Sequence, residues 1–344
     1  MILIRLSRTL FRYILMAVTI ACLVVGLNNC ASPSGNTPSA SAPASSTDAT
    51  TETVSTNNDP KININSAILS ELDKLEAKLG VPALSHKIQA SRPYGSIDDL
   101  VSKDVVTQQQ FDQIKDLVTV EDIVLTGEAK DVDYLTKLGL MKGHMLVAGE
   151  LLALNQPEQA IPHLGHPVEE IYVDLQPQLG ERNVAEFSDV LTRVQELVKS
   201  KPNDPKVKTE FEAAMQAIDK AIAALPENQR QAPAFGLQVM NEMLDTAAAE
   251  YTASVSDGKI SAAIEYQDSR GFVNYVRDAL FKNIEAPLGK SNAGVDTNLK
   301  AKLAELAKAW PAPVPPQAPV VPVDEVVDQV KAIEQTAKPV IQKG

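Results

Sequence analysis

The sequence predicts an all-α protein, and three observations carry that prediction. Aromatic residues make up only 4% of the 344 residues, fewer than a β-sandwich or a β-barrel would use. Alanine, leucine, lysine, glutamate and glutamine are plentiful, and these residues favour helices. Apolar residues recur at three- and four-residue spacing, whereas no alternating stretch is long enough for a sheet. We expect a small helical module over residues 61–122 and a larger helical bundle over residues 131–310.

The first thirty residues predict export and take no part in the expected fold. A basic region that ends at Arg12 precedes the apolar run of residues 13–27, which is short for a membrane-spanning helix but typical of a secretory signal. The following Asn28-Asn29-Cys30 resembles a bacterial lipoprotein signal, which implies that Cys30 is lipidated and becomes the new amino terminus. An uncleaved anchor and ordinary cleavage after Ala31 are the alternatives. Each route predicts an exported, extracytoplasmic protein, on the periplasmic or lumenal side of a membrane or at the cell surface.

Residues 31–60 are rich in Ser, Thr, Ala and Pro and predict a disordered tether, because almost no apolar side chain there offsets the entropy of ordering the chain. The formal charge of the whole chain is −12, so the protein has no general attraction to nucleic acid or anionic lipid. Its two cysteines are Cys22 and Cys30, which excludes a disulfide scaffold.

Four short helices are expected in the module. Asn65 or Ser66 caps the first, whose apolar stripe consists of Leu69, Leu72, Leu75 and Leu79. The second covers residues 83–91. Two capping boxes then mark the starts of the third and fourth helices, Ser96 with Asp99 and Thr107 with Gln110.

The opening segment Ile62-Asn63-Ile64-Asn65-Ser66-Ala67 and the later segment of residues 92–100 resemble the helix-hairpin-helix module of the ComEA competence family. The photosystem II protein PsbU carries a similar module. In the DNA-binding members, backbone amides of a glycine hairpin meet a phosphate at a helix start. The resemblance implies capture of double-stranded DNA during uptake, through phosphate contacts from Lys78, Gly80, Val81, His86, Lys87 and Arg92.

The hairpin departs from the pattern of that family. Gly80-Val81 runs directly into Pro82, so the second glycine is missing, and the module holds seven Lys or Arg against ten Asp or Glu. The alternative is a module kept for protein contact or spacing. The likeness to PsbU then implies a scaffold that attaches to a protein partner in a membrane or envelope complex.

The bundle is expected to consist of helices separated by prolines. One helical stripe runs from Tyr134 to Leu152, a helix covers residues 158–163, and Pro167 begins the next helix. Further helices are expected over residues 184–200, 205–225, 234–255, 259–284 and 299–309, with Pro202, Pro226 and Pro287 in loops. Residues 311–322 contain six prolines and predict an extended spacer. A short amphipathic helix and tail over residues 323–344 would dock on the bundle or on a partner.

Three of the four histidines lie close together in the sequence, at His144, His163 and His166. With Glu170 they could form a carboxylate–imidazole cluster of the kind that holds iron, zinc or copper in a helical bundle. The polar run of residues 265–270 could complete such a site. The alternative is structural, with His144 in the core, His163 on the surface, His166 as a helix cap and Arg270 paired with Asp268.

The motifs of several enzyme classes are missing. The sequence has no Walker loop, no Gly-x-Gly-x-x-Gly, no Gly-x-Ser-x-Gly and no cysteine after residue 30. We therefore expect a non-enzymatic protein. DNA capture, which needs no cofactor, is the leading hypothesis. An envelope metal-binding protein that holds a transition metal is the second hypothesis, and a protein-binding scaffold is the third.

Overall fold

The computed structural model describes residues 61–122 and 124–343, so the expectations for the export signal, the tether and Cys30 lie outside the described residues. The all-α prediction is confirmed, since helices dominate and the strands that the described residues form are two residues long. No described helix combines the length and apolar character needed to cross a membrane.

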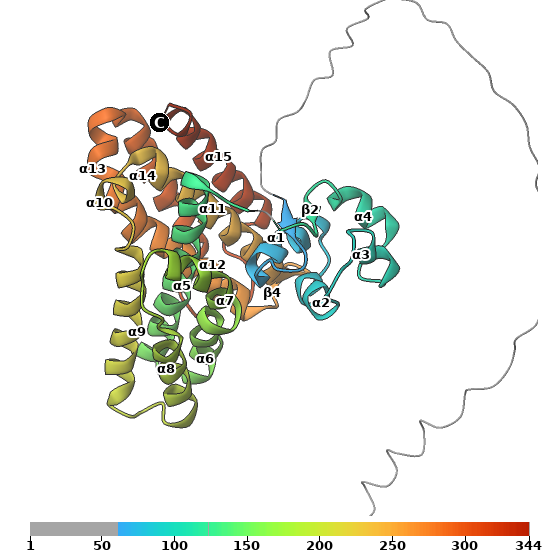
Figure 1. Ribbon diagram of the computed structural model, residues 1–344, viewed down its shortest axis with the longest axis horizontal. Helices are drawn as coiled ribbons and strands as arrows, with labels where there is room; N and C mark the ends of the chain where they lie inside the picture. The colour runs from blue at the N-terminus through green and yellow to red at the C-terminus, as the bar shows by residue number, and fades with distance from the viewer. Residues whose placement is uncertain (1–60, 123, 344) are drawn as a thin grey trace, which may run out of the picture. The chain divides into compact units, whose positions relative to one another are not determined.

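The module has a hydrophobic core of its own, which includes Ile64, Leu72, Leu75, Ile88 and Phe111. A short parallel bridge closes it, with Ile62 opposite Val118. Its elements are β1 (Ile62–Asn63), α1 (Leu69–Leu79), α2 (Leu84–Ala90), α3 (Asp99–Ser102), α4 (Gln108–Ile114) and β2 (Val118–Thr119) (Figure 1).

The structure tests two of the predicted helix starts in the module. The capping box before α4 is confirmed, because the Gln110 amide donates to Thr107 Oγ1 at 3.3 Å and the Thr107 amide donates to Gln110 Oε1 at 2.8 Å. The prediction that Asn65 or Ser66 caps α1 is wrong, because the N-cap is Ile68. Asn65 instead accepts from the Tyr94 amide at 2.7 Å and donates to its carbonyl at 2.9 Å.

The bundle is built around α5 and α11, two long helices with extensive buried surface. Its elements are α5 (Gly127–Ala153), α6 (Pro157–His166), η1 (Pro167–Ile171), α7 (Tyr172–Glu181), α8 (Ser188–Ser200), α9 (Lys206–Ile222), α10 (Glu227–Arg230), α11 (Pro233–Ser254), β3 (Val255–Ser256), β4 (Lys259–Ile260), α12 (Ala263–Tyr275), η2 (Val276–Leu280), α13 (Phe281–Ser291), α14 (Ala293–Leu306), η3 (Ala307–Ala309) and α15 (Val323–Ile341). The strands β3 and β4 form an antiparallel pair.

Prolines interrupt the bundle less than the sequence suggested. Pro167 does not begin a separate helix, since α6 runs to His166 and continues through the π-helical turn η1 into α7. Pro287 lies inside α13, not in a loop. A proline removes one backbone donor from a helix, and here the fully buried neighbours Ile284 and Leu288 hold the helix against the core.

The C-terminal segment lies against the bundle. Helix α15 packs on α11 and α14 and buries Val326, Val330 and Ile333. The proline-rich segment before it accepts hydrogen bonds through its carbonyls. Donors from the bundle are the Tyr251 hydroxyl to Val321 at 2.7 Å, the Tyr266 hydroxyl to Ala312 at 3.1 Å and the Gln267 amide to Pro313 at 3.1 Å.

Helix α1 joins the module to the bundle. Ile68, directly before α1, belongs to the hydrophobic core of the bundle. α1 packs on α11, and Lys74 pairs with Glu242 at 3.7 Å and Asp245 at 3.8 Å. The module therefore forms a wall beside α11.

Candidate metal centre

Three histidines and one aspartate converge inside the bundle. Nδ1 of His144 lies 2.6 Å from Asp268 Oδ1, and Nδ1 of His163 lies 2.7 Å from the same oxygen. Nδ1 of His166 lies 3.3 Å from Asp268 Oδ2. One nitrogen or oxygen atom from each of these four residues lies within 4.8 Å of the others. We call this cluster, His144, His163, His166 and Asp268, the His₃Asp centre.

Three helices position the centre. α5 carries His144, α6 carries His163 and His166 one turn apart, and α12 carries Asp268. The π-helical turn η1 begins directly after His166. Such turns are frequent at functional sites.

Two glycines let α5 and α12 approach closely enough to bring His144 to Asp268. A Cβ atom added to Gly143 would lie 3.0 Å from the Phe272 backbone nitrogen and 3.1 Å from the Gly271 carbonyl carbon. A Cβ atom on Gly271 would overlap the carbonyl oxygen of Gly143. Any side chain at either position would therefore push apart the helices that carry these two ligands.

Gln267 fixes the protonation of one ring nitrogen of His163. The Gln267 side-chain nitrogen donates to the Pro313 carbonyl at 3.1 Å and to Gln159 Oε1 at 2.8 Å. Its oxygen is therefore the atom that faces His163 Nε2 at 2.8 Å. Nε2 must donate this bond, so a neutral His163 directs the lone pair of Nδ1 at Asp268. A lone pair and a carboxylate oxygen 2.7 Å apart need a proton or a metal ion next to them.

The centre is buried and its hydrogen bonding is incomplete. The exposed fractions of His144, His163 and Asp268 are 1%, 0% and 3%. His144 Nε2 is buried and has no hydrogen-bond partner. His166 Nδ1 is buried and lies 3.3 Å from Asp268 Oδ2 without the geometry of a hydrogen bond. Buried polar atoms in native proteins are nearly always paired, so the free Nε2 of His144 is suited to bind a metal ion.

Charge and burial oppose each other within the centre. Burial lowers the pKa of His144 to about 4, against the attraction of Asp268. Burial also acts to lower the pKa of His166, but Asp268, Glu170 and Glu169 outweigh it and raise that pKa to about 9. Burial acts to raise the pKa of Asp268, yet the three histidines hold it well below its ordinary value. Asp268 is therefore an anion whose charge is shared among the imidazoles.

The structure brings together the three predicted histidines and places Glu170 at their edge. Glu170 Oε1 lies 3.7 Å from His166 Nε2, outside the group of four. The structural alternative is wrong for His163, which is buried, and for Arg270, which pairs with Glu150 at 2.7 Å. Asp268 did not stand out from the sequence as a ligand. The polar run of residues 265–270 between apolar turns was the available signal, but it did not say which of its side chains faces the histidines.

A cavity of about 90 Å³ lies beside the centre. His144, His166 and Asp268 line it on one side, and its other charged lining residues are Glu170, Glu250 and Glu265. Burial, together with the charges of Asp73, Asp268 and Glu265, raises the pKa of Glu250 well above its ordinary value. Burial also raises the pKa of Glu265.

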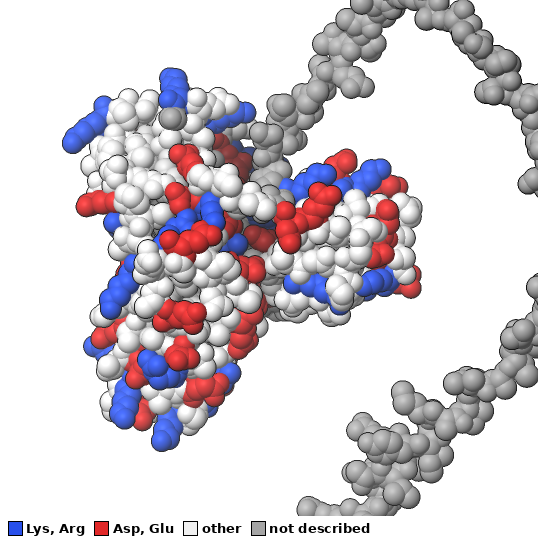
Figure 2. Space-filling model, viewed as in Figure 1, with Lys and Arg blue, Asp and Glu red and all other residues white. Residues whose placement is uncertain are grey.

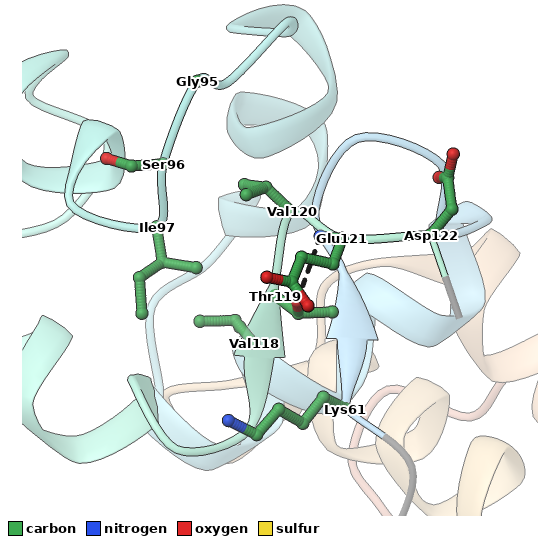
Figure 3. A pocket seen from close by; sticks show the side chains of 9 residues that line it. All are labelled: Lys61, Gly95, Ser96, Ile97, Val118, Thr119, Val120, Glu121 and Asp122. Carbon is green, nitrogen blue, oxygen red and sulfur yellow. Dashed lines mark hydrogen bonds between the residues drawn. The ribbon is translucent and has the colours of Figure 1, made fainter. Parts of the chain in front are cut away.

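A larger hollow of about 640 Å³ lies in the module beside β2 (Figure 3). Lys61 and Asp122 extend in different directions there, and the hydrogen bond drawn joins the Glu121 amide to Thr119 Oγ1 at 3.0 Å. Its charged side chains therefore do not converge as those of the His₃Asp centre do.

The hairpin of the module already contains its own anion. Glu76 accepts hydrogen bonds from the Ala83 amide at 2.8 Å and from the Ser85 amide at 3.2 Å, both at the start of α2. Its carboxylate therefore occupies the position at which a phosphate would meet that helix start. The amides of Gly80 and Val81 both donate to the Glu76 carbonyl, at 2.8 and 3.4 Å. None of these four amides is left for a ligand.

The predicted phosphate-binding side chains do not form a common surface. Arg92 donates to the carbonyls of Ile64 at 2.8 Å and Ala67 at 2.6 Å. Lys87 donates to the carbonyls of Asp104 and Val105. His86 lines the cavity beside the centre, while Lys78 is exposed. On the face that Figure 2 shows, lysines and arginines of the module lie among acidic residues.

The imidazole and carboxylate donors of the centre suit a borderline transition metal. Three imidazoles with one carboxylate are ligands that Fe²⁺, Zn²⁺ and Cu²⁺ all accept. The unpartnered Nε2 of His144 and the lone pair of His163 fit such an ion. When bound, the metal would supply the positive charge that the facing donor atoms lack.

Comparison with known proteins gives a match in the C-terminal part of the chain. Residues 226–344 match the family described as the iron permease-associated 4-helix bundle domain, and they contain α11, α12 with α13, α14 and α15 as four long helical segments. No curated protein and no solved structure matches the chain. The expected membership of the ComEA competence family, and with it DNA binding and uptake, is wrong. The match lies outside residues 61–122, and Glu76 fills the phosphate position of the hairpin. The chain is thus similar, over residues 226–344, to a domain that accompanies iron permeases.

Proposed function

We propose that this protein binds a transition-metal ion at the His₃Asp centre and handles iron in association with an iron permease. The observation that carries the proposal is the convergence of three imidazoles on one buried carboxylate, with Nε2 of His144 buried and unpartnered. Iron is named before zinc or copper because residues 226–344, which include Asp268, match an iron permease-associated domain. Iron is the cargo in this proposal, and no chemical step is required of the protein.

The centre combines two parts of the chain. Asp268 lies inside the matched region, whereas His144, His163 and His166 precede it. The whole bundle is therefore the binding unit in this proposal. The expected export and membrane attachment through residues 1–30 would place that unit beside a permease, and both remain part of the proposal.

Anaerobic titration of the full chain with Fe²⁺, and with Co²⁺ as a spectroscopic probe, tests the proposal. We expect stoichiometric binding and visible Co²⁺ bands typical of mixed nitrogen and oxygen ligands. His163→Gln should weaken binding by at least about tenfold, because it removes one ligand and retains a polar side chain. Glu158→Gln, on the exposed start of α6, is the control.

The outcomes separate the two parts of the proposal. Binding of Zn²⁺ or Cu²⁺ with no uptake of Fe²⁺ under competition would contradict the assignment of iron and leave the metal centre in place. Equal Co²⁺ binding by the wild type and by His163→Gln would contradict the centre itself.

A further inference from the structure

The cavity beside the centre lies where the module and the bundle meet. Ser70 and His86 of the module line it, opposite Glu250 on α11 and Glu265 on α12. Ser70 is 2% exposed, whereas His86 is exposed. One end of the cavity is therefore closed by the start of α1, and His86 marks the end that faces solvent.

The lining of this cavity is rich in carboxyl groups. Glu170, Glu250, Glu265 and Asp268 line it together with histidines, and none of the described residues around it is a lysine or an arginine. Carboxyl oxygens and imidazole nitrogens are both metal ligands. The cavity therefore offers donor atoms to a small divalent cation.

An independent observation links the cavity to a ligand. His144 and His166 line the same cavity, and Nε2 of His144 is buried without a hydrogen-bond partner. The cavity therefore combines carboxyl oxygens with metal-binding imidazole nitrogens. Borderline transition metals accept both kinds of donor.

The volume suits this role. A water molecule needs about 10–15 Å³ of such space, so a cavity of about 90 Å³ holds a cation with part of its water shell. The carboxylates of Glu250 and Glu265 do not belong to the group of four ligand atoms. They are placed to hold the ion through water before it reaches the His₃Asp centre.

We propose that this cavity is the access route and outer binding site for a divalent metal cation, with Glu265 and His86 at its mouth and Glu170 and Glu250 further in. The inference rests on the proposed metal-binding function and deepens it, because it assigns the module a role as one wall of the route. The carboxyl groups offer oxygen donors to the cation, and the wall restricts its path.

Stopped-flow binding of Co²⁺ to the full chain tests the route with two variants of different kinds. Glu265→Gln removes one charge at a half-buried position. It should lower the association rate constant about three- to tenfold and weaken its dependence on ionic strength. Glu158→Gln, an exposed glutamate outside the cavity, is the matched control and should keep the wild-type rate.

His86→Trp narrows the mouth at an exposed position, where a larger side chain does not disturb the core. Association and dissociation rate constants should fall together, by about fivefold or more, while the dissociation constant changes less than about twofold. A parallel fall in both rates is the signature of a blocked path, since a lost ligand would raise the dissociation rate.

Unchanged rates in both variants, with wild-type Co²⁺ binding intact, would overturn the route and leave the proposed function standing. A wild type that binds no Co²⁺ would overturn both. A raised dissociation rate in His86→Trp, with an unchanged association rate, would show that His86 is a ligand and would also contradict the route.

Discussion

The hairpin of the module and the His₃Asp centre of the bundle use similar groups in opposite ways. In the hairpin, the Glu76 carboxylate accepts hydrogen bonds from two amides and the Ser85 hydroxyl. In the centre, one carboxylate faces three imidazoles, and Nε2 of His144 is buried and unpartnered. A family motif has no capacity for a ligand when its donors are already satisfied. Residues far apart in the sequence do have that capacity when they converge and leave a hydrogen-bonding atom unsatisfied. Hydrogen-bond saturation therefore distinguishes a binding site better than the presence of a motif.

Asp268→Asn should have a large effect on both the stability of the bundle and its metal binding. The substitution leaves buried imidazoles without their anion, and breaking a buried charge pair costs about 3–5 kcal/mol. Metal binding should be lost as well. Urea unfolding and Co²⁺ titration measure the two effects. Asp189→Asn, at an exposed position of α8, should change neither, and wild-type stability in Asp268→Asn would contradict the account of the centre.

Glu76→Ala should destabilise the hairpin of the module. Three donors lose their acceptor, and we expect a loss of about 2 kcal/mol, because unsatisfied buried donors cost about 1–3 kcal/mol. Hydrogen exchange in peptides that cover residues 69–90 should accelerate, while saturating Co²⁺ still binds. Glu212→Ala, exposed on α9, is the control. Loss of Co²⁺ binding in Glu76→Ala would show that the hairpin and the centre are not independent.

Gly271→Ala should separate the helices that hold two ligands. The added methyl group overlaps the Gly143 carbonyl, and overpacking of this kind costs about 1–3 kcal/mol. The Co²⁺ affinity should fall with it, because His144 and Asp268 move apart. Gly180→Ala places its methyl group in open space on α7 and should leave stability unchanged or slightly higher. Equal behaviour of the two variants would contradict the importance of the close helix contact.

Asp73 should give an effect that appears only as the pH changes. Burial raises its pKa to about 8 from an ordinary value of 3.8, with the Glu76 carboxylate adding to the shift. Because the folded state then binds the proton more tightly than the unfolded state, stability falls as the pH rises from about 4 to about 8. Urea unfolding at pH 5.5, 7 and 8.5 measures this effect. The free energy of unfolding of Asp73→Asn, relative to that of the wild type, should increase as the pH rises. A constant difference between the two proteins would contradict this assignment.

The helices were largely predictable because their signals are local. The stripe Leu69 to Leu79 became α1, and the capping box at Thr107 became the start of α4. Pro287 misled because burial of Ile284 and Leu288 outweighs its one missing donor. Pro167 misled because the π-helical turn η1 carries the helix through it.

The site was predictable only in part. His144, His163 and His166 stood out because histidine is rare in this chain, and the structure brings them together. Asp268 did not stand out, since it is 124 positions from His144 and the chain has many acidic residues. A single sequence does not show which faces of α5, α6 and α12 meet.

That separation along the chain has a further consequence. An unfolded chain carries the four ligands too far apart to compete for an ion, so high-affinity loading waits for folding. If the His₃Asp centre binds a metal as proposed, the ions present in the compartment where α5, α6 and α12 assemble decide which metal the protein acquires. A chain translocated before folding would choose among the metals outside the cytoplasm, irrespective of those available where it was synthesised.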